Sequence, residues 1–417
     1  MRFSAYHIAP EIKQSLEELG FKRPTDIQFK AIPSILKNED VLAIAQTGTG
    51  KTAAFAIPVV NILYNRKRRN DTPGIKCVVM VPTHELAIQI TEVFDNVAKH
   101  TNIVTLGIYG GVEQDPQIRN LKEGVDIIVA TPGRLFDLIS QKYIKLRTVE
   151  ILVLDEADHM LDMGFYDDIK ELTTYIPLQR QTLFFSATIS ERIKDLAYSL
   201  VRTEAIRIQI SPKDPVSKNV DHSVMFIEID DKRFFLERLV NENPQSKILV
   251  FVRTKVRAER VFEAMKRVKI KAITMHGGKE QSDRLKVLNE FKSGETKVLI
   301  TTDVSARGID IANVDFVVNY DLPDVPENYV HRVGRTGRGT KKGHAVSFCS
   351  KEEKPILKQI EKFLHNPIKV LEVAKDDYKE TLLYTEDTQD NWKLLMREAE
   401  REEKNRKAKP HKKGKRR

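Results

Sequence analysis

The chain has 417 residues, of which 41% are hydrophobic and 31% charged, and its formal net charge is +10. This length exceeds one ordinary domain and predicts two domains and a tail. No apolar run approaches the length of a membrane span, and the first residues lack the apolar segment of a secretory signal. Cys77 and Cys349 fit no metal-binding spacing and indicate buried thiols in a reducing compartment, so we expect a cytoplasmic protein without a membrane partner.

The positive charge is concentrated at the C-terminal end. Residues 404–417 contain nine Lys or Arg and no acid, which leaves a net charge of +1 for the rest of the chain. This composition predicts a disordered basic tail. Such a tail either solubilises the protein or binds nucleic acid phosphates, and we expect the second.

The first half of the chain alternates short apolar runs with helical patterns. The runs, in chain order, are DVLAIA, KCVVMVP, VDIIVATP, VEILVLDE and QTLFFSAT. Continuous Val, Ile and Leu runs of this length, separated by helices, are typical of parallel strands that are buried on both faces. Residues 1–208 are therefore predicted to form an α/β domain.

A second domain with the same pattern is predicted over residues 221–368. Its apolar runs are SKILVFV, KAITMHG, TKVLITTD, VDFVVNYD and HAVSFC. Residues 209–220, QISPKDPVSKNV, contain two prolines and no apolar periodicity, which predicts a linker and hinge. Residues 369–403 are predicted to be a charged helical extension around Trp392, followed by the basic tail.

The segment QTGTGKT follows the first apolar run and precedes a helix. Gly48 and Gly50 allow backbone N–H groups to surround phosphates, Lys51 reaches the β and γ oxygens, and the Thr52 hydroxyl is a ligand for Mg²⁺. The usual phosphate loop begins with glycine, whereas this one begins with Ala45. The segment predicts a nucleotide site.

Four acids, Asp155, Glu156, Asp158 and Asp162, follow another strand of the same domain. An aspartate at a strand end holds Mg²⁺, usually through water, and the next glutamate can orient the attacking water. Together with the phosphate loop, this pair predicts an ATPase site. Asp158 also suits a solvated helix start, and Asp162 is predicted to be structural.

The second domain has no phosphate loop, but it contains three arginines in HRVGRTGRG. Arg332, Arg335 and Arg338 are spaced three residues apart among glycines. They suit phosphate ligands or arginine fingers, and the alternative is a basic surface turn. If they reach the nucleotide of the first domain, ATP lies between the two domains.

The order and spacing of these motifs, from about Phe3 to residue 368, resemble those of the DEAD-box RNA helicases of compact bacterial type. The tetrapeptide itself is Asp155-Glu156-Ala157-Asp158. The resemblance implies two RecA-like parallel-sheet domains in tandem, with ATP and Mg²⁺ as cofactors and RNA as partner. It implies an RNA-stimulated ATPase that closes its domains on ATP and RNA and opens a few base pairs locally.

The resemblance also assigns roles at the nucleotide. In GFKRPTDIQ, Phe21 stacks on adenine and Gln28 bonds its edge, with Phe3 as the upstream aromatic. The phosphate loop supplies Thr47, Gly48, Thr49, Gly50, Lys51 and Thr52, and Asp310 meets the ribose. Mg²⁺ is held through Thr52 and Asp155. The catalytic residues are Lys51, Asp155, Glu156, His331, Arg335 and Arg338, and Asp158, Ser186 and Thr188 couple hydrolysis to closure.

The remaining motifs resemble RNA backbone contacts, which position a strand without reading its sequence. In the first domain they are Pro82, Thr83, His84, Gly110, Gly111, Thr131, Pro132, Gly133 and Arg134. In the second they are Arg253, Gln281, Arg284, Thr302 and Arg307. His84 departs from the family, which usually has arginine there. Because histidine is largely neutral at pH 7 and offers no bidentate fork, we expect one weaker RNA contact without loss of activity.

Two other functions share these motifs. An ATP-gated RNA clamp or assembly scaffold with little unwinding has the same residues, and a DNA translocase is disfavoured by the adenine-reading motif. Ribosomal precursors and RNA-decay proteins are both plausible cellular partners, and a eukaryotic protein with a basic import tail is a less favoured reading. The oligomeric state is open.

Overall fold

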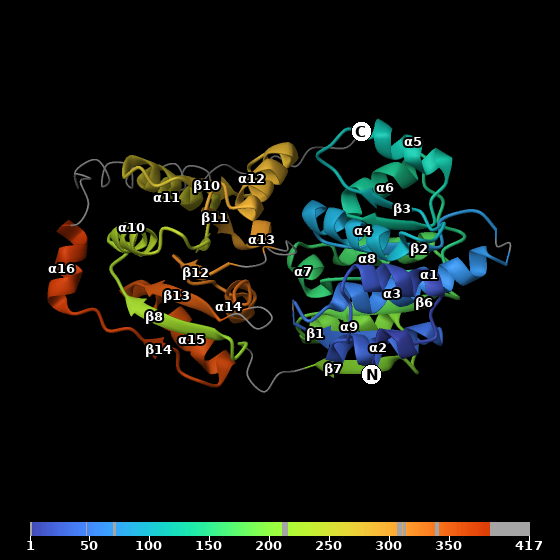
Figure 1. Cartoon of the computed structure of the whole chain (residues 1–417), viewed down its shortest axis with the longest axis horizontal. Helices are drawn as coiled ribbons and strands as arrows, with labels where there is room; N and C mark the ends of the chain where they lie inside the picture. The colour runs from blue at the N-terminus through green and yellow to red at the C-terminus, as the bar shows by residue number, and fades with distance from the viewer. Residues whose placement is uncertain are drawn as a thin grey trace.

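The computed structural model describes residues 2–46, 48–69, 72–210, 216–306, 311, 314–337 and 342–383. Four predicted site residues, Thr47, Arg307, Asp310 and Arg338, lie outside the described residues, as do the extension beyond Leu383 and the basic tail. The chain forms two lobes that lie side by side (Figure 1), and each lobe contains its own seven-stranded sheet.

The sheet of the first lobe is parallel, with the strand order β3-β4-β2-β5-β6-β1-β7. Its strands are β1 (Val41–Ala45), β2 (Cys77–Met80), β3 (Thr105–Ile108), β4 (Ile127–Ala130), β5 (Ile151–Leu154), β6 (Gln181–Ser186) and β7 (Ile206–Ile210). Each residue of β1, β2, β4, β5 and β6 is buried, as expected for apolar runs that are covered on both faces.

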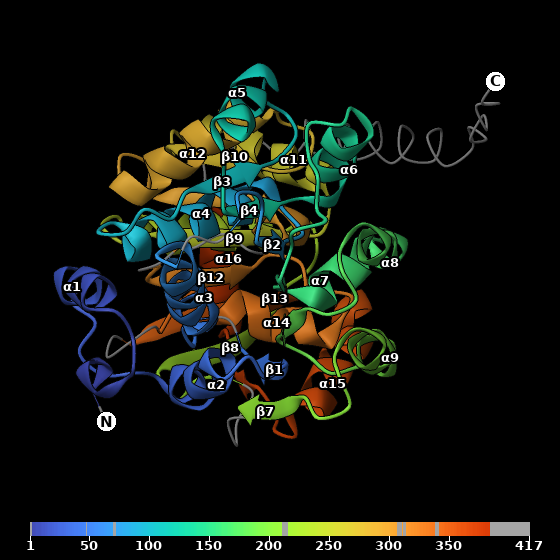
Figure 2. The same cartoon turned by 90° about the vertical axis from the view of Figure 1, so that its right-hand side faces the viewer.

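Helices cover both faces of this sheet, as Figure 2 shows with the first lobe in front. They are η1 (Phe3–Ala5), α1 (Pro10–Glu18), α2 (Asp26–Leu36), α3 (Lys51–Lys67), α4 (His84–Ala98), α5 (Asp115–Glu123), α6 (Pro132–Ser140), α7 (Ala157–Asp162), α8 (Tyr166–Tyr175) and α9 (Glu191–Leu200). Alternate strand residues face opposite layers. Val79 belongs to the hydrophobic layer that includes residues of α1 to α4, whereas Val78 and Met80 belong to the layer that includes residues of α5 to α9.

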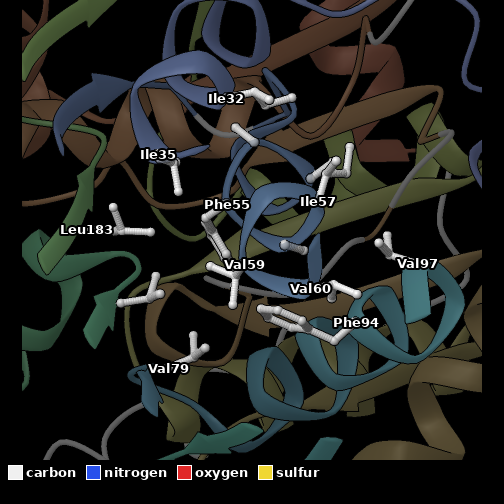
Figure 3. Close-up of a cluster of buried hydrophobic side chains, with 14 of the residues drawn as sticks. Ile32, Ile35, Phe55, Ile57, Val59, Val60, Val79, Phe94, Val97 and Leu183 are labelled. Atoms are coloured by element: carbon white, nitrogen blue, oxygen red, sulfur yellow. The ribbon is translucent and has the colours of Figure 1, made fainter. Parts of the chain in front are cut away.

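The core around α3 illustrates this packing (Figure 3). The Phe55 ring of α3 contacts two others, with its centroid 5.2 Å from that of Phe185 in β6 and 6.0 Å from that of Phe94 in α4. Ile32 and Ile35 of α2 cover the same helix from the other side. This layer holds the first turn of α3, and therefore the phosphate loop, against the sheet.

The second lobe repeats the architecture, with the parallel order β10-β11-β9-β12-β13-β8-β14. Its strands are β8 (Val220–Phe226), β9 (Ile248–Val252), β10 (Ala272–Met275), β11 (Val298–Thr302), β12 (Phe316–Asn319), β13 (Gly343–Cys349) and β14 (Lys369–Val370). Its helices are α10 (Lys232–Glu242), α11 (Lys255–Arg267), α12 (Gln281–Ser293), α13 (Asp303–Ala306), α14 (Pro326–Val333), η2 (Lys351–Glu353), α15 (Lys354–Leu364) and α16 (Lys375–Leu383).

The predicted fold class is confirmed, and all ten predicted apolar runs contain strands. The sequence patterns missed β3, β7, β8 and β14. Three of these lie at a sheet edge and the fourth next to one, where half-exposed strands mix polar and apolar residues. β7 continues to Ile210, inside the predicted linker, and β14 begins at Lys369, just after the predicted second domain.

Helix α16 packs against the second lobe. The Tyr378 hydroxyl lies 2.8 Å from the Asp231 carboxylate, and its ring lies 5.0 Å from that of Phe235. Arg238 donates to the Thr381 hydroxyl at 2.7 Å. The described part of the C-terminal extension is therefore docked on α10. No helix in the described ranges has both the length and the apolarity that a membrane crossing requires.

Candidate functional site

The sheet order brings three polar segments together at one edge of the first lobe. β6 lies between β1 and β5, and all three strands are parallel. The phosphate loop after β1, Ser186 at the end of β6 and Asp155 after β5 therefore emerge side by side at the carboxyl ends of the strands. Ligands bind at this edge in open parallel sheets.

The phosphate loop has the backbone expected of an anion cradle. Gly48 and Gly50 have φ values of 80° and 90°, in the left-handed region that favours glycine. α3 starts directly after Gly50, so its first N–H groups face the loop. The Lys51 ammonium group is buried and finds no hydrogen-bond partner among the described residues. A buried ammonium group without a hydrogen-bond partner favours an anionic ligand.

The predicted adenine-reading residues are joined to this loop. The Gln28 side chain donates to the Gly50 carbonyl at 3.1 Å and accepts from the Thr25 backbone N–H at 3.0 Å, completing the capping box of α2. These two bonds fix the orientation of the amide. The Phe21 and Phe3 rings contact each other edge to face, with centroids 5.7 Å apart.

The two acids after β5 have different environments. Burial raises the pKa of the Asp155 carboxyl to about 6, and the Lys51 charge offsets only part of this effect. Burial also acts to raise the pKa of Glu156. The His159 ring and the charges of Lys51 and Arg335 outweigh this effect and lower the pKa to about 2. His159 Nδ1 lies 3.4 Å from Glu156 Oε2.

Glu156 also has an unusual backbone, since its φ is 53° at the start of α7. A non-glycine residue in the left-handed region costs about 1–2 kcal/mol. Such conformations are concentrated at functional sites. Here the conformation turns the chain from β5 into α7 immediately after Asp155.

The third acid, Asp158, binds the segment that follows β6. Its Oδ2 atom accepts hydrogen bonds from the Thr188 backbone N–H at 3.0 Å, the Thr188 hydroxyl at 3.1 Å and the Ala187 N–H at 3.2 Å. The Ser186 hydroxyl donates to the Thr188 carbonyl at 2.8 Å. The structure thus brings together the three residues predicted to couple hydrolysis to closure.

A cavity of about 360 Å³ between the lobes is lined by Glu156 and Asp158 on one side and by His331 of α14 and Arg335 of the following turn on the other. The first lobe contributes Glu156, Asp158 and Thr188 to its lining, and the second contributes His331 and Arg335. Arg335 is buried and its Nε donates to the His331 carbonyl at 3.3 Å. The predicted catalytic residues Glu156 and His331, separated by 175 positions, therefore line one cavity.

Arg332 does not belong to this cavity. Its guanidinium makes two short bonds to the Asp303 carboxylate, at 2.6 and 2.7 Å, and a third to the Asp321 carbonyl at 2.6 Å. Only 1% of its surface is exposed. Arg332 is therefore an interior residue that braces α14, although its spacing from Arg335 suggested a phosphate ligand.

The RNA-contact candidates of the first lobe gather at a groove of about 420 Å³. It is lined by Pro82, His84, Gly110, Thr131, Pro132, Gly133 and Arg134, together with Asp137, Met163 and Phe165. The other two candidates lie beside it. The Thr83 hydroxyl caps α4 by accepting from the Leu86 N–H, and Gly111 approaches the second lobe, where an added Cβ would lie 3.0 Å from that of Gln281.

The candidates of the second lobe divide into two groups. Gln281 and Arg284, at the start of α12, bind the Glu85 carboxylate of the first lobe at 3.0 and 2.9 Å. Arg253 and Thr302 lie at the carboxyl ends of the neighbouring strands β9 and β11. The Arg253 guanidinium lies 3.2 Å from both the Leu322 carbonyl and the Asp324 carboxylate.

Three residues at these sites were not predicted from the sequence: Thr25, Glu85 and His159. The sequence signals were weak but present. Thr25 and Gln28 have the spacing of a capping box, Glu85 is an acid in the first turn of a predicted helix, and His159 lies three positions after Glu156, on the same helical face.

Comparisons with known proteins agree with this geometry. The DEAD/DEAH box helicase family matches residues 25–196, and the helicase conserved C-terminal domain matches residues 231–340. The DEAD-box ATP-dependent RNA helicase CshA of Bacillus subtilis is 40% identical over 361 residues, which cover 86% of this chain and 72% of CshA.

Two solved structures of one yeast protein are similar to this chain. S. cerevisiae Dbp5 bound to RNA and ADP BeF3 is 32% identical, with a TM-score of 0.81 and coverage of 91% of this chain and 97% of that one. A Dbp5 variant bound to Nup159, Gle1, IP6 and ADP is 31% identical and covers similar shares, 90% and 97%, but its TM-score is 0.62.

By TM-score, the chain is more similar to the RNA-bound Dbp5 structure than to the second one. The motifs, their geometry, the family matches and the identity to CshA lead to one assignment. The chain belongs to the DEAD-box family of ATP-dependent RNA helicases.

Proposed function

We propose that ATP and RNA close the two lobes on each other, and that hydrolysis then reopens them. The observation that supports this most strongly is the cavity in which Glu156 and Asp158 of the first lobe face His331 and Arg335 of the second. Neither lobe contains both the acids and the arginine. A complete ATPase site therefore requires closure, which links turnover to the conformation that binds RNA.

Within this site we assign the roles by chemistry. Lys51 and the first turn of α3 bind the phosphates, Asp155 and Thr52 hold Mg²⁺ largely through water, and Glu156 orients the attacking water. The buried Asp155 carboxylate, beside an unpartnered Lys51, fits an Mg²⁺–phosphate ligand. The ion would neutralise charge on the phosphates. Arg335 stabilises the negative charge of the transition state, together with Arg338.

For RNA we propose that the groove of the first lobe and the residues at the carboxyl ends of β9 and β11 hold one strand by its backbone. These groups offer backbone N–H donors, hydroxyls and arginines, which suit phosphate and sugar rather than base edges. Closure would hold the strand in a path that a duplex cannot follow, so a few base pairs would open locally.

One comparison distinguishes this function from its alternatives. We expect RNA, and not DNA of the same sequence, to stimulate ATP hydrolysis. We also expect ATP-dependent release of the shorter strand from an RNA duplex of about ten base pairs. A short duplex is needed because local opening breaks only a few base pairs, and each stacked step contributes about 1.4 kcal/mol to duplex stability, the mean value for DNA. RNA-stimulated ATPase activity without strand release would favour the RNA clamp. Equal stimulation by DNA would contradict the proposal.

The adenine site makes a further prediction. Gln28 has one amide hydrogen and one lone pair beyond its two internal bonds, which match N7 and the N6 amino group of adenine. We expect Gln28→Ala to raise the KM for ATP by about 10- to 100-fold, the equivalent of two neutral hydrogen bonds. The preference for ATP over GTP should decrease in parallel, because guanine presents O6 in place of the amino group. A variant that still prefers ATP would show that Gln28 does not read the base.

The pH dependence of hydrolysis follows from Asp155. Because burial raises the pKa of its carboxyl to about 6, the group becomes neutral as the pH falls through this value in the free protein. A neutral carboxyl binds Mg²⁺ poorly, so kcat/KM for ATP should decrease below pH 6 and approach a tenfold loss per pH unit. The measurement is a pH profile at saturating RNA. In Asp155→Asn the activity should be low at every pH, without this inflection.

We also propose a cytoplasmic location, supported by two cysteines that are buried and free. Ribosomal precursors and RNAs undergoing decay are the proposed cellular substrates. Crosslinking of the intact protein to RNA in cells, followed by identification of the bound RNAs, tests which of the two it binds.

A further inference from the structure

The side chain of His84 lies where the two lobes meet at the RNA groove. Its Nδ1 atom is 3.2 Å from Oε1 of Gln281, a residue of the other lobe. The same Gln281 amide donates from Nε2 to Glu85 Oε1 at 3.0 Å, and Arg284 approaches that oxygen to 2.9 Å. His84, Glu85, Gln281 and Arg284 thus form one polar bridge between α4 and α12.

This bridge determines which ring nitrogen of His84 carries hydrogen. A carboxylate only accepts hydrogen bonds, so the Gln281 amide must turn its NH₂ group toward Glu85 and its oxygen toward His84. An amide oxygen also only accepts, so His84 Nδ1 must be the donor. In a neutral imidazole the other nitrogen, Nε2, then has a free lone pair and is an acceptor.

The surroundings favour the neutral ring. Burial lowers the pKa of His84, with smaller contributions from the charges of Arg284 and Arg134. The Gln281 bond and the Glu85 charge act in the opposite direction, but the net change is a decrease. At neutral pH the groove therefore contains an uncharged acceptor at this position.

His84 lines the groove, and no residue in the described part of the chain hydrogen-bonds to its Nε2. The neighbouring residue is Gly110, where an added Cβ would lie in van der Waals contact with Nε2, 3.6 Å away. The same groove also offers donors. The Nη1 atom of Arg134 is buried without a hydrogen-bond partner among the described residues, and the N-terminus of α6 opens at Pro132 and Gly133.

A groove with donors and one neutral acceptor matches an RNA backbone better than a DNA backbone. Phosphate oxygens need donors, which Arg134 and α6 supply. The 2′-hydroxyl of ribose is the backbone group that can donate, and DNA lacks it. Arginine, which the family usually has here, can only donate, so it can bind a phosphate or a hydroxyl oxygen but cannot accept a hydrogen bond from the 2′-hydroxyl.

We propose that Nε2 of His84 accepts a hydrogen bond from a 2′-hydroxyl of bound RNA, which makes His84 a residue that selects ribose over deoxyribose. This inference rests on the proposed placement of RNA in the groove. It assigns His84 a role different from that of the arginine it replaces. The arginine would contact a phosphate, whereas His84 recognises the sugar.

The test is a scan of a short single-stranded RNA in which one nucleotide at a time carries 2′-fluoro in place of 2′-hydroxyl. Fluorine keeps an electronegative atom on the sugar but cannot donate a hydrogen bond. With the full chain, Mg²⁺ and a non-hydrolysable ATP analogue, we expect one scanned position to lose affinity in the wild-type protein but not in the His84 variants. The expected loss is about three- to tenfold, the effect of one neutral hydrogen bond.

Two variants and one control complete the design. His84→Arg should lose the penalty at that position and steepen the salt dependence of binding by about 0.7 in log–log slope, the effect of one added phosphate contact. His84→Phe keeps a ring of similar shape but has no hydrogen-bond acceptor, so it should lose the penalty without a steeper slope. His100→Arg makes the same charge change at a surface residue bound to Glu18, and should keep the penalty.

The outcomes separate this inference from the proposed function. A penalty that persists in both His84 variants, or that is absent at every position in the wild type, would overturn the role of Nε2. Absence of ATP-dependent RNA binding by the wild-type chain would instead contradict the proposed function itself.

Discussion

Replacing Glu156 with glutamine is expected to abolish most ATP turnover while leaving the binding of ATP and RNA intact. The substitution removes only the negative charge, and the amide has nearly the same shape. Glu156 is held deprotonated by His159 and by the charges of Lys51 and Arg335, with a pKa of about 2, so it is always available to accept hydrogen bonds from water. Loss of a positioned base costs about 10²–10⁴-fold in rate.

The measurement is kcat for ATP at saturating RNA, together with RNA affinity in the presence of a non-hydrolysable ATP analogue. Asp167→Asn is the matched control, because Asp167 is an exposed acid of the same lobe, in the first turn of α8, and is not among the residues that line the cavity. We expect its kcat to stay within about twofold of the wild type, as for most surface substitutions. Robust hydrolysis by Glu156→Gln would show that another group positions the water.

Arg335→Ala is expected to have the second large effect, a loss of about 10³–10⁵ in kcat, as for removal of an arginine finger. Two described arginines lie in α14 and the turn after it, and of these Arg335 is the one that lines the cavity facing the acids. Its positive charge acts on Glu156 across the lobe boundary. ATP affinity should change far less than turnover, because the charge is needed most in the transition state.

Arg332, three positions earlier, provides the contrast. Arg332→Ala should lower the free energy of unfolding by about 3–5 kcal/mol, since it leaves the Asp303 carboxylate without its buried partner. The midpoint of urea unfolding measures this effect, and Arg335→Ala should shift it much less. If Arg335→Ala unfolds the lobe and Arg332→Ala only slows turnover, the two assignments are reversed.

The parts of the molecule that were predictable from the sequence are those whose structure depends on residues close together in the sequence. The phosphate loop, the acids after β5 and the ten long strands are continuous segments with a clear pattern. Contacts between distant residues left no such pattern. Nothing in the spacing of Arg332 and Arg335 distinguishes an interior brace from a cavity residue, because α14 ends between them, at Val333, and the two side chains enter different surroundings.

The contact of His84 with Gln281 is another example, because it joins the two lobes across 197 positions. The sequence indicated that His84 replaces a usual arginine, but its hydrogen-bonding state depends on Glu85 and Gln281 in space. The edge strands were missed for a related reason. β3 and β7 are partly exposed, so their polar residues interrupt the apolar runs that identify central strands.

The bonds of Gln28 have a consequence for engineering this protein. The same amide caps α2 at Thr25 and braces the phosphate loop at Gly50, and a Cβ added at Gly50 would lie 2.5 Å from the amide nitrogen. One substitution at position 28 would therefore change the nucleotide preference and weaken the phosphate loop at the same time. A redesign that accepts another base would have to supply a new brace for Gly50 first, and positions 25, 28 and 50 would have to be varied together.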